Sequence, residues 1–353
     1  MKLGTVTLTN GAHRLVAPVD AHDAPEAGPW IDLHEAGVAA HVAHPHVLGS
    51  LEALLEAGDE GLHAAKVALD HAHSHAGAGA SWIVTADGAR LRAPILRPGK
   101  VLALAGNYMA HRTEGASGLT TPAEQLVPEV FCKPMTSIVG HGEAIRIPGA
   151  PVIATDYEGE LGVVIGRRGH RISEADAMQY VAGYFPLNDV SGRKLDPGMD
   201  RDPAQAARNG YFDWLIGKWP DTFCPIGPWM VTADEVADPM NLHMVVRVNG
   251  EQRQETSTAM MLHSIVRTIA WCSKFMTFEP GDIIATGTPA GVGSARGIFL
   301  QAGDVVEVEI EGLGIALALE RRRSRWVTLG ASSLSGVTQS WEIVAASQLR
   351  SRG

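Results

Sequence analysis

The chain has 353 residues, 45% of them hydrophobic, and a formal net charge of −10 at pH 7 with its histidines neutral. This length suffices for a sizeable core and favours about two domains. The acidic balance argues against a nucleic-acid partner, and the absence of a run of about 18 apolar residues argues against a membrane-spanning helix. An anionic substrate would need a local cation.

The cysteines are few and widely spaced, at Cys132, Cys224 and Cys272. An odd number at such spacing does not indicate a disulfide framework, so we interpret all three as small buried side chains. The N-terminal segment lacks the apolar core of a signal peptide. The expected location is therefore the cytoplasm.

Residues 1–95 predict a small N-terminal α+β domain. Ser50 is a good N-cap for a helix in which the leucines among residues 51–55 share one face. Gly58 interrupts this helix, and a second helical piece follows over residues 62–69.

Three alternate histidines, His71, His73 and His75, raise the question of a transition-metal site. They have no carboxylates arranged around them and lie far in sequence from the acidic cluster described below. We therefore interpret them as a solvated helix end that leads into a Gly/Ala linker at 76–80.

Residues 96–320 predict a largely β catalytic domain, because short apolar runs alternate with Gly, Pro and Asn turn signals. Asn249-Gly250 is a strong hairpin signal, and one helix is expected over residues 258–276. Residues 321–353 form a C-terminal extension to which we assign no chemistry. The predicted strand cores are Val101–Ala105, Leu161–Ile165, Met244–Val248, Ile283–Ala285 and Val305–Ile310.

An acidic segment leads into one of these strands. Side chains two apart in a strand point the same way, so Asp156, Glu158 and Glu160 are expected to converge on one face. Carboxylates this close repel each other unless a cation neutralises them, and an all-oxygen set favours Mg²⁺. Asp189, at the end of a strand-like aromatic segment, is the candidate third ligand. The alternative is an outward acidic strand face, with Asp189 capping a turn.

A second pair of polar side chains, His111 and Glu114, follows the strand at 101–105. Three residues apart on a helical turn, they share a face and can form a hydrogen bond. A carboxylate that holds one imidazole nitrogen leaves the other free as a general base. The alternative is an exposed pair without function.

Two loops are unusual for bulk structure. Lys218 is a lone lysine among aromatics in a loop bounded by Gly and Pro. Residues 285–293 end a strand in a glycine-rich loop whose backbone amides can cradle an anion. A carboxylate fits this loop as well as a phosphate does, because no Walker-type lysine follows.

Taken together, these segments resemble the fumarylacetoacetate hydrolase superfamily, in particular its two-domain bacterial-type acylpyruvate hydrolases and 2-hydroxyhepta-2,4-diene-1,7-dioate isomerases. Seven motifs occur in the family's order, which makes the resemblance specific. They are Gly-Asn-Tyr-x-x-His-x-x-Glu at 106–114, Phe-x-Lys-Pro at 131–134, Asp-Tyr-Glu-x-Glu-Leu at 156–161, Asn-Asp-Val-Ser-x-Arg at 188–193, Gly-Lys-x-x-Asp-x-Phe-x-Pro-x-Gly-Pro at 217–228, Val-Asn-Gly at 248–250 and Pro-Gly-Asp-x-Ile-x-Thr-Gly-Thr-Pro-x-Gly-Val-Gly at 280–293.

The resemblance implies an α+β, mainly β fold with a rolled catalytic sheet, a small N-terminal domain and a homodimer. It implies a Mg²⁺ (or Mn²⁺) cofactor and a small 2-oxo acid substrate. The implied metal ligands are Glu158, Glu160 and Asp189. The implied catalytic residues are His111, Glu114 and Lys218, the first two on a segment that closes as a lid. The implied substrate contacts are Tyr108, Arg193, Gly287 and Thr288.

The expected reaction is hydrolysis of a C–C bond in an acylpyruvate-like or other β-diketo acid, as in aromatic catabolism, with water activated by the His-Glu pair. The alternatives are an isomerase, decarboxylase or lyase of a 2-oxo acid on the same scaffold, or a non-catalytic binding relative. One departure from the family pattern stands out: Asp196 replaces a common glutamine, and a polar stretch follows at 197–210. This departure alters the expected substrate wall while leaving the metal ligands in place.

Overall fold

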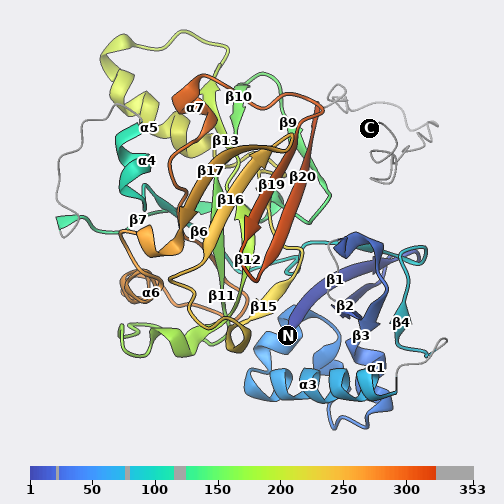
Figure 1. Ribbon diagram of the computed structural model, residues 1–353. Coiled ribbons are helices and arrows are strands. Elements are labelled where there is room, and N and C mark those ends of the chain that lie inside the picture. Colours follow the sequence, from blue (N-terminus) through green and yellow to red (C-terminus); the bar gives the residue numbers. More distant parts are fainter. Residues whose placement is uncertain (21–23, 76–79, 115–124, 323–353) are drawn as a thin grey trace, which may run out of the picture.

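The computed structural model describes residues 1–20, 24–75, 80–114 and 125–322. It is rich in strands, and the predicted mainly β, α+β class is confirmed. One long mixed sheet runs through the molecule, and a second sheet packs on its catalytic part (Figure 1). Among the described residues, no helix is both long and apolar enough to cross a membrane.

The long sheet joins the N-terminal segment to the catalytic part, because Lys2 and Leu3 of its first strand pair with Val231 and Met230. Its central strands, β11 (Gly159–Ile165) and β12 (Val181–Asn188), are buried along their whole length and consist mainly of apolar residues and glycine. In spatial order the strands are β4 (Ile83–Val84), β3 (Trp30–Asp32), β2 (His13–Pro18), β1 (Lys2–Leu8), β15 (Met230–Thr232), β12 (Val181–Asn188), β11 (Gly159–Ile165), β18 (Ile283–Ala285), β6 (Val101–Ala105) and β7 (Glu129–Lys133), with β5 (Ala89–Leu91) also on β1.

The second sheet covers one face of β11 and β12. Apolar side chains alternate along its strands, and those that face β11 form a hydrophobic core with Leu161, Val163 and Tyr184. Its hairpin turns at Asn249-Gly250, both with positive φ, as the sequence predicts. The order is β17 (Glu251–Ser257), β16 (His243–Val248), β19 (Val305–Ile310), β20 (Gly314–Arg322) and β9 (Ala144–Ile147). Two small sheets pair β10 (Val152–Asp156) with β13 (Ser191–Leu195) and β14 (Cys224–Pro225) with β8 (Ile138–Val139).

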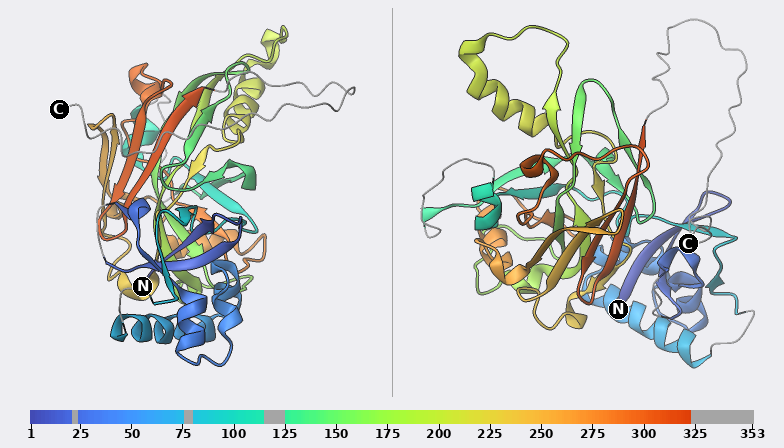
Figure 2. Two further views of the ribbon diagram at one scale, coloured as in Figure 1. Left: turned by 90° about the vertical axis from the view of Figure 1, so that its right-hand side faces the viewer. Right: turned by 45° about the horizontal axis from the view of Figure 1, so that its top comes forward.

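Helices cover one face of the N-terminal strands, where leucines and alanines fill a common core (Figures 1 and 2). The predicted Ser50 cap is confirmed, since its hydroxyl accepts a hydrogen bond from the Ala53 amide at 3.1 Å. The helices here are α1 (Leu33–Ala39), α2 (Leu51–Glu56) and α3 (Asp59–Ser74). The catalytic part carries α4 (Met109–Glu114), α5 (Ala206–Ile216), α6 (Ile265–Cys272) and α7 (Gly293–Arg296).

The helix expected over 258–276 is shorter than predicted. Only α6 is α-helical, and Ser264 caps it by accepting from the Arg267 amide. The preceding residues are diverted because the Leu262 and His263 amides donate to the backbone and side-chain oxygens of Asn107. The apolar period continues through this stretch, but its backbone is engaged in joining β6 to α6.

The three alternate histidines lie at the end of α3, as expected. His71 stacks on His75 with ring centroids 4.3 Å apart and meets the edge of Trp82. Among the described residues, no group of three metal-binding side chains includes them.

Candidate functional site

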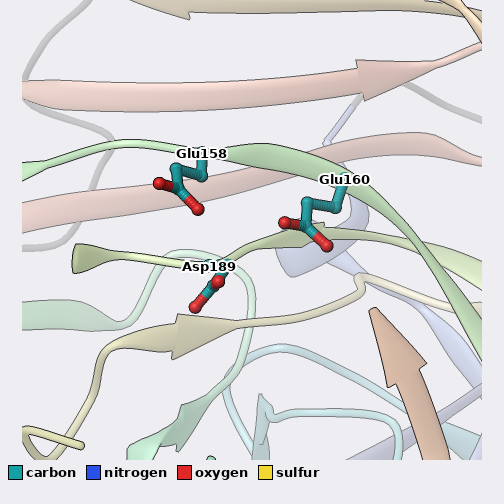
Figure 3. Close-up of side chains that lie close together, drawn as sticks. All are labelled: Glu158, Glu160 and Asp189. Atoms are coloured by element: carbon teal, nitrogen blue, oxygen red, sulfur yellow. The ribbon is translucent and has the colours of Figure 1, made fainter. Parts of the chain in front are cut away.

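Three carboxylates meet beside the central strands. Glu158 precedes β11, Glu160 lies within it, and Asp189 follows β12 (Figure 3). The antiparallel pairing brings them together, because Gly159 is opposite Asn188 and the Asp189 amide donates to the Glu158 carbonyl at 2.8 Å. All three are buried, and each has an oxygen within 4.8 Å of one from the others.

Asp156 does not join this group, which corrects the expectation that three alternate acidic residues share one face. The strand β10 ends at Asp156 and β11 begins only at Gly159, so the chain does not keep one strand alternation through the segment. The Asp156 carboxylate instead accepts from the amides of Gly293 and Ser294 at 2.7 and 2.9 Å. It also pairs with Arg193 at 2.9 Å.

Two buried lysines and the partly buried Arg193 offset the charge of the carboxylates. Lys218 donates to Glu158 and Asp189, both at 2.7 Å, and Arg193 pairs with the other Glu158 oxygen. Lys133 donates to the second Asp189 oxygen at 2.5 Å and to the Lys218 carbonyl at 2.9 Å. Burial alone would raise the pKa of Glu158, but the charges of Lys218 and Arg193 hold it below its ordinary value.

Of the three carboxylates, Glu160 has the fewest donors and cations to offset its negative charge. Its Oε2 accepts from the Gly287 amide at 2.7 Å, while Oε1 is buried without a hydrogen-bond partner among the described residues. Burial, and then the neighbouring charges of Asp189 and Glu158, raise its pKa well above the ordinary value. An orphaned buried oxygen within an all-oxygen set is what a hard divalent cation would satisfy. The residues therefore fit Mg²⁺ or Mn²⁺.

His111 and Glu114 form the expected pair on α4. The His111 Nδ1 and Glu114 Oε1 are 2.6 Å apart, and the other Glu114 oxygen accepts from the Gly291 amide at 2.7 Å. The carboxylate is thereby fixed from two sides. His111 is also among the charges that act on Glu158, so the pair lies near the three clustered carboxylates. For the described residues, its Nε2 has no hydrogen-bond partner.

The glycine-rich loop cradles carboxylates, but they belong to the protein itself. Its amides at Gly287, Gly291 and Gly293 hold Glu160, Glu114 and Asp156, respectively. The sequence predicted an anion-binding loop without identifying the anion. The loop therefore fixes one of the three clustered carboxylates, the carboxylate of the histidine pair and the partner of Arg193 relative to one another.

The expected substrate contacts differ in how free their polar atoms are. The Tyr108 hydroxyl is buried and has no hydrogen-bond partner among the described residues, and burial followed by the charge of Glu160 raises its pKa. The Thr288 hydroxyl donates to the Gly159 carbonyl and accepts from Gln254, both at 2.9 Å. Tyr108 therefore retains a free polar group, whereas the Thr288 side chain is already engaged.

Sequence reasoning did not assign Lys133 and Gln254 to the site. The signal for Lys133 lies in the Phe-x-Lys-Pro motif, which contributes to the family resemblance but does not by itself indicate a role for the lysine. Gln254 carried no signal, because a glutamine on a hairpin strand is ordinary. Gln254 reaches the site only because β17 packs beside the glycine-rich loop, where its side chain donates to Thr288 and Pro289.

The departure at residues 196–210 lies beside this site. It leads into α5, which stands out from the body of the molecule (Figure 2). Arg193 and Trp214 both line a cavity of about 460 Å³ between β13 and α5. Trp214 packs edge-on against Phe131, whose ring centre lies 5.1 Å from the Lys218 ammonium. The helix into which the altered segment leads therefore connects to Lys218 through the rings of Trp214 and Phe131.

Comparison with known proteins gives several similar enzymes. A mitochondrial oxaloacetate tautomerase of Xenopus laevis is 39% identical over 296 residues, which are 83% of this chain and 85% of that protein. A mitochondrial oxaloacetate tautomerase of Homo sapiens is 44% identical over 227 residues, covering 64% of this chain and 67% of the relative.

Among solved structures, 2-hydroxyhepta-2,4-diene-1,7-dioate isomerase from Mycobacterium marinum matches 92% of this chain and 100% of its own, with a TM-score of 0.63 and 30% identity. Maleylpyruvate hydrolase from Sphingobium sp. SYK-6, solved with manganese(II) and pyruvate, matches 91% of this chain and 99% of its own, with a TM-score of 0.66 and 26% identity.

The family profile described as "Fumarylacetoacetate (FAA) hydrolase C-terminal" matches residues 100–318, the part that holds every carboxylate and cation of the site. This match spans more than half of the chain, and the resemblance drawn from the motifs is confirmed. The chain belongs to the fumarylacetoacetate hydrolase family of enzymes.

Proposed function

We propose that the chain is a divalent-metal-dependent tautomerase of oxaloacetate, or of a closely similar 2-oxo diacid. The observation that carries the proposal is the buried carboxylate group with one orphaned oxygen, set beside a fixed histidine–carboxylate pair. The similarity to oxaloacetate tautomerases supports this reaction among those that such a site could carry out. This favours the isomerase alternative of the sequence analysis over C–C hydrolysis.

The carboxylates of Glu158, Glu160 and Asp189 would hold Mg²⁺ or Mn²⁺. A bound cation of this kind supplies Lewis-acid polarisation of a 2-oxo group. His111, oriented through Nδ1 by Glu114, moves the proton with its Nε2 between the enol oxygen and carbon 3. Lys218 offsets negative charge that develops on oxygen.

Hydrolysis of an acylpyruvate-like acid is the second candidate. It is favoured by the same pair, since an imidazole with a free Nε2 can activate water, and by the likeness to a maleylpyruvate hydrolase. It differs from tautomerisation in one respect: a C–C bond breaks and water is incorporated.

One experiment separates the two candidates. The purified protein with Mg²⁺ is mixed with enol oxaloacetate and, in a parallel reaction, with an acylpyruvate, and the loss of the enol absorbance is followed together with pyruvate formation. We expect the enol to disappear at least about 100-fold faster than without protein, as acid–base catalysis allows, with no pyruvate formed and no acceleration after chelation. Metal-dependent cleavage of acylpyruvates without any acceleration of the enol loss would establish hydrolysis instead.

We also propose a homodimer that buries the exposed face of α5. Tyr211, Phe212 and Ile216 of this helix are 59%, 46% and 39% exposed, and Ile153, on a strand that lines the same cavity, is 65% exposed. Apolar patches of this kind mark association surfaces.

Light scattering of the wild type is expected to give twice the mass of one chain, and Phe212→Glu is expected to give the mass of a monomer. The control is Phe275→Glu, at an exposed residue just after α6, which should leave the mass unchanged. A wild-type monomer would exclude the dimer.

A further inference from the structure

Both polar atoms of the Gln254 side-chain amide are engaged in hydrogen bonds next to the metal ligands. It lies on β17 and is 2% exposed. Its oxygen accepts from the Gly159 amide at 3.0 Å. Its nitrogen donates to the Thr288 hydroxyl at 2.9 Å and to the Pro289 carbonyl at 2.8 Å. Because the Thr288 hydroxyl donates in turn to the Gly159 carbonyl, the three side-chain contacts close a ring around Gly159.

This ring lies on the edge of β11 just beyond the point where its pairing with β18 ends. Next to β11, the ladder of β18 runs from Val164 to Gly162 and ends with the Thr286 amide on the Leu161 carbonyl. The next peptide groups on that edge of β11 are the N–H and C=O of Gly159. Buried backbone groups without partners destabilise a fold, and the side chains of Gln254 and Thr288 replace the absent strand. The peptide groups of β11 beyond the end of β18 are thereby hydrogen-bonded by side chains, and no further strand is needed at this edge.

The same strand supports the glycine-rich loop at a second point. A Cβ atom at Gly291 would lie 2.3 Å from the Arg253 carbonyl, so the loop packs directly on the β17 backbone. The Gly291 amide holds Glu114, and the Gly287 amide holds Glu160. A shift of residues 288–291 away from β17 would therefore move the Gly291 amide and the carboxylate of the histidine pair, whereas the Gly287 amide follows Thr286, which is fixed to the Leu161 carbonyl.

We propose that Gln254 is a positioning residue for the substrate site. It fixes the loop at 287–293 relative to Gly159, and so sets the distance between the metal-binding carboxylates on either side of Gly159 and the loop that faces them. This inference rests on the proposed function in that a 2-oxo acid bound at the metal lies against this loop. Gln254 touches no substrate and acts through Thr288 and the Gly159 peptide.

The test is Gln254→Glu, which keeps the shape and the acceptor for the Gly159 amide but replaces the donor to Thr288 and Pro289 with an oxygen. The probe is oxalate, a chelating analogue of a 2-oxo acid, titrated by calorimetry into Mn²⁺-loaded protein. We expect oxalate to bind about tenfold or more weakly, the size of effect that an unpaired buried polar group produces. We expect the Mn²⁺ affinity, measured by electron paramagnetic resonance, to change less than about threefold, because Glu160 remains on the Gly287 amide.

Gln252→Glu is the matched control, since it makes the same change on an exposed residue of the same strand and should leave both affinities unaltered. If Gln254→Glu does not fold, Thr288→Val removes the hydroxyl that bonds to Gln254 and to the Gly159 carbonyl. It should give the same loss of oxalate affinity with little change in Mn²⁺ affinity. Unchanged oxalate affinity, or equal loss of oxalate and Mn²⁺ binding, would overturn the positioning role. Because oxalate binding needs no turnover, a wild-type protein that lacks tautomerase activity would sink the proposed function and leave this test intact.

Discussion

Replacing Glu160 with glutamine is expected to abolish metal binding while leaving the metal-free protein at least as stable as the wild type. The raised pKa of Glu160 means that its ionised form is disfavoured in the fold by burial and by the charges of Asp189 and Glu158. A neutral amide removes that repulsion and can still accept from the Gly287 amide. With fewer anionic ligands, the site should lose Mn²⁺ affinity by at least about 100-fold and turnover by about as much.

The measurement is a pair of thermal melts for each protein, with chelator and with Mn²⁺. Wild type should be stabilised by Mn²⁺ in proportion to the logarithm of its concentration, and Glu160→Gln should not respond. The control is Asp282→Asn, a carboxylate that is also fully buried and paired with a lysine, Lys100, at 2.5 Å outside the site. It should lower stability with and without Mn²⁺ and keep the response to the metal. A Glu160→Gln protein that melts lower in chelator and still responds to Mn²⁺ contradicts the assignment.

The two variants are expected to change the stability of the metal-free protein in opposite directions. This difference distinguishes a metal ligand from a structural ion pair. Asp282 accepts from the Lys100 and Glu279 amides and is met by a lysine, so its charge is compensated in the fold. Glu160 has one amide and an orphaned oxygen. Breaking a compensated buried pair leaves an unpaired charge, whereas neutralising Glu160 removes an uncompensated one.

The strands of the catalytic part were accessible to sequence reasoning because their apolar runs are bounded by turn residues. The Asn249-Gly250 hairpin and the Ser50 cap depend on residues adjacent in sequence, and both were predicted correctly. The helix at 258–276 was predicted too long because the stretch before Ser264 is bound to Asn107, some 155 residues away. Such a contact leaves no trace in local periodicity.

Long-range packing also limits what could be predicted of the site. Spacing alone placed Asp156 with Glu158 and Glu160, since it cannot show that one strand ends and another begins between them. The loop at 287–293 was identified as anion-binding from its glycines, yet the anions are side chains drawn from three other segments. The motif order of the family brought His111 and Lys218 to this site, which no pattern within either segment could do.

Replacing His111 with alanine is expected to lower turnover by about 100- to 10,000-fold while leaving metal binding intact, the range that loss of a general acid–base group covers. Among the described residues, the His111 side chain forms its one hydrogen bond with Glu114, and it acts on Glu158 only through its charge. The rates of enol loss and the Mn²⁺ affinity of the same preparations check both parts. Equal loss of rate and of Mn²⁺ binding would show that the histidine supports the metal and not the proton transfer.

Glu114→Gln sharpens this prediction, because its amide oxygen can still accept from Gly291 while its nitrogen then faces the His111 Nδ1. An amide that donates there forces the imidazole hydrogen onto Nε2, and the ring can no longer accept a proton at that atom. We expect a loss of rate close to that of His111→Ala with little change in structure. His243, which pairs with Glu255 at 3.0 Å on the exposed face of β16 and β17, provides the matched control, since His243→Ala removes an equivalent pair remote from the carboxylates and should leave the rate unchanged.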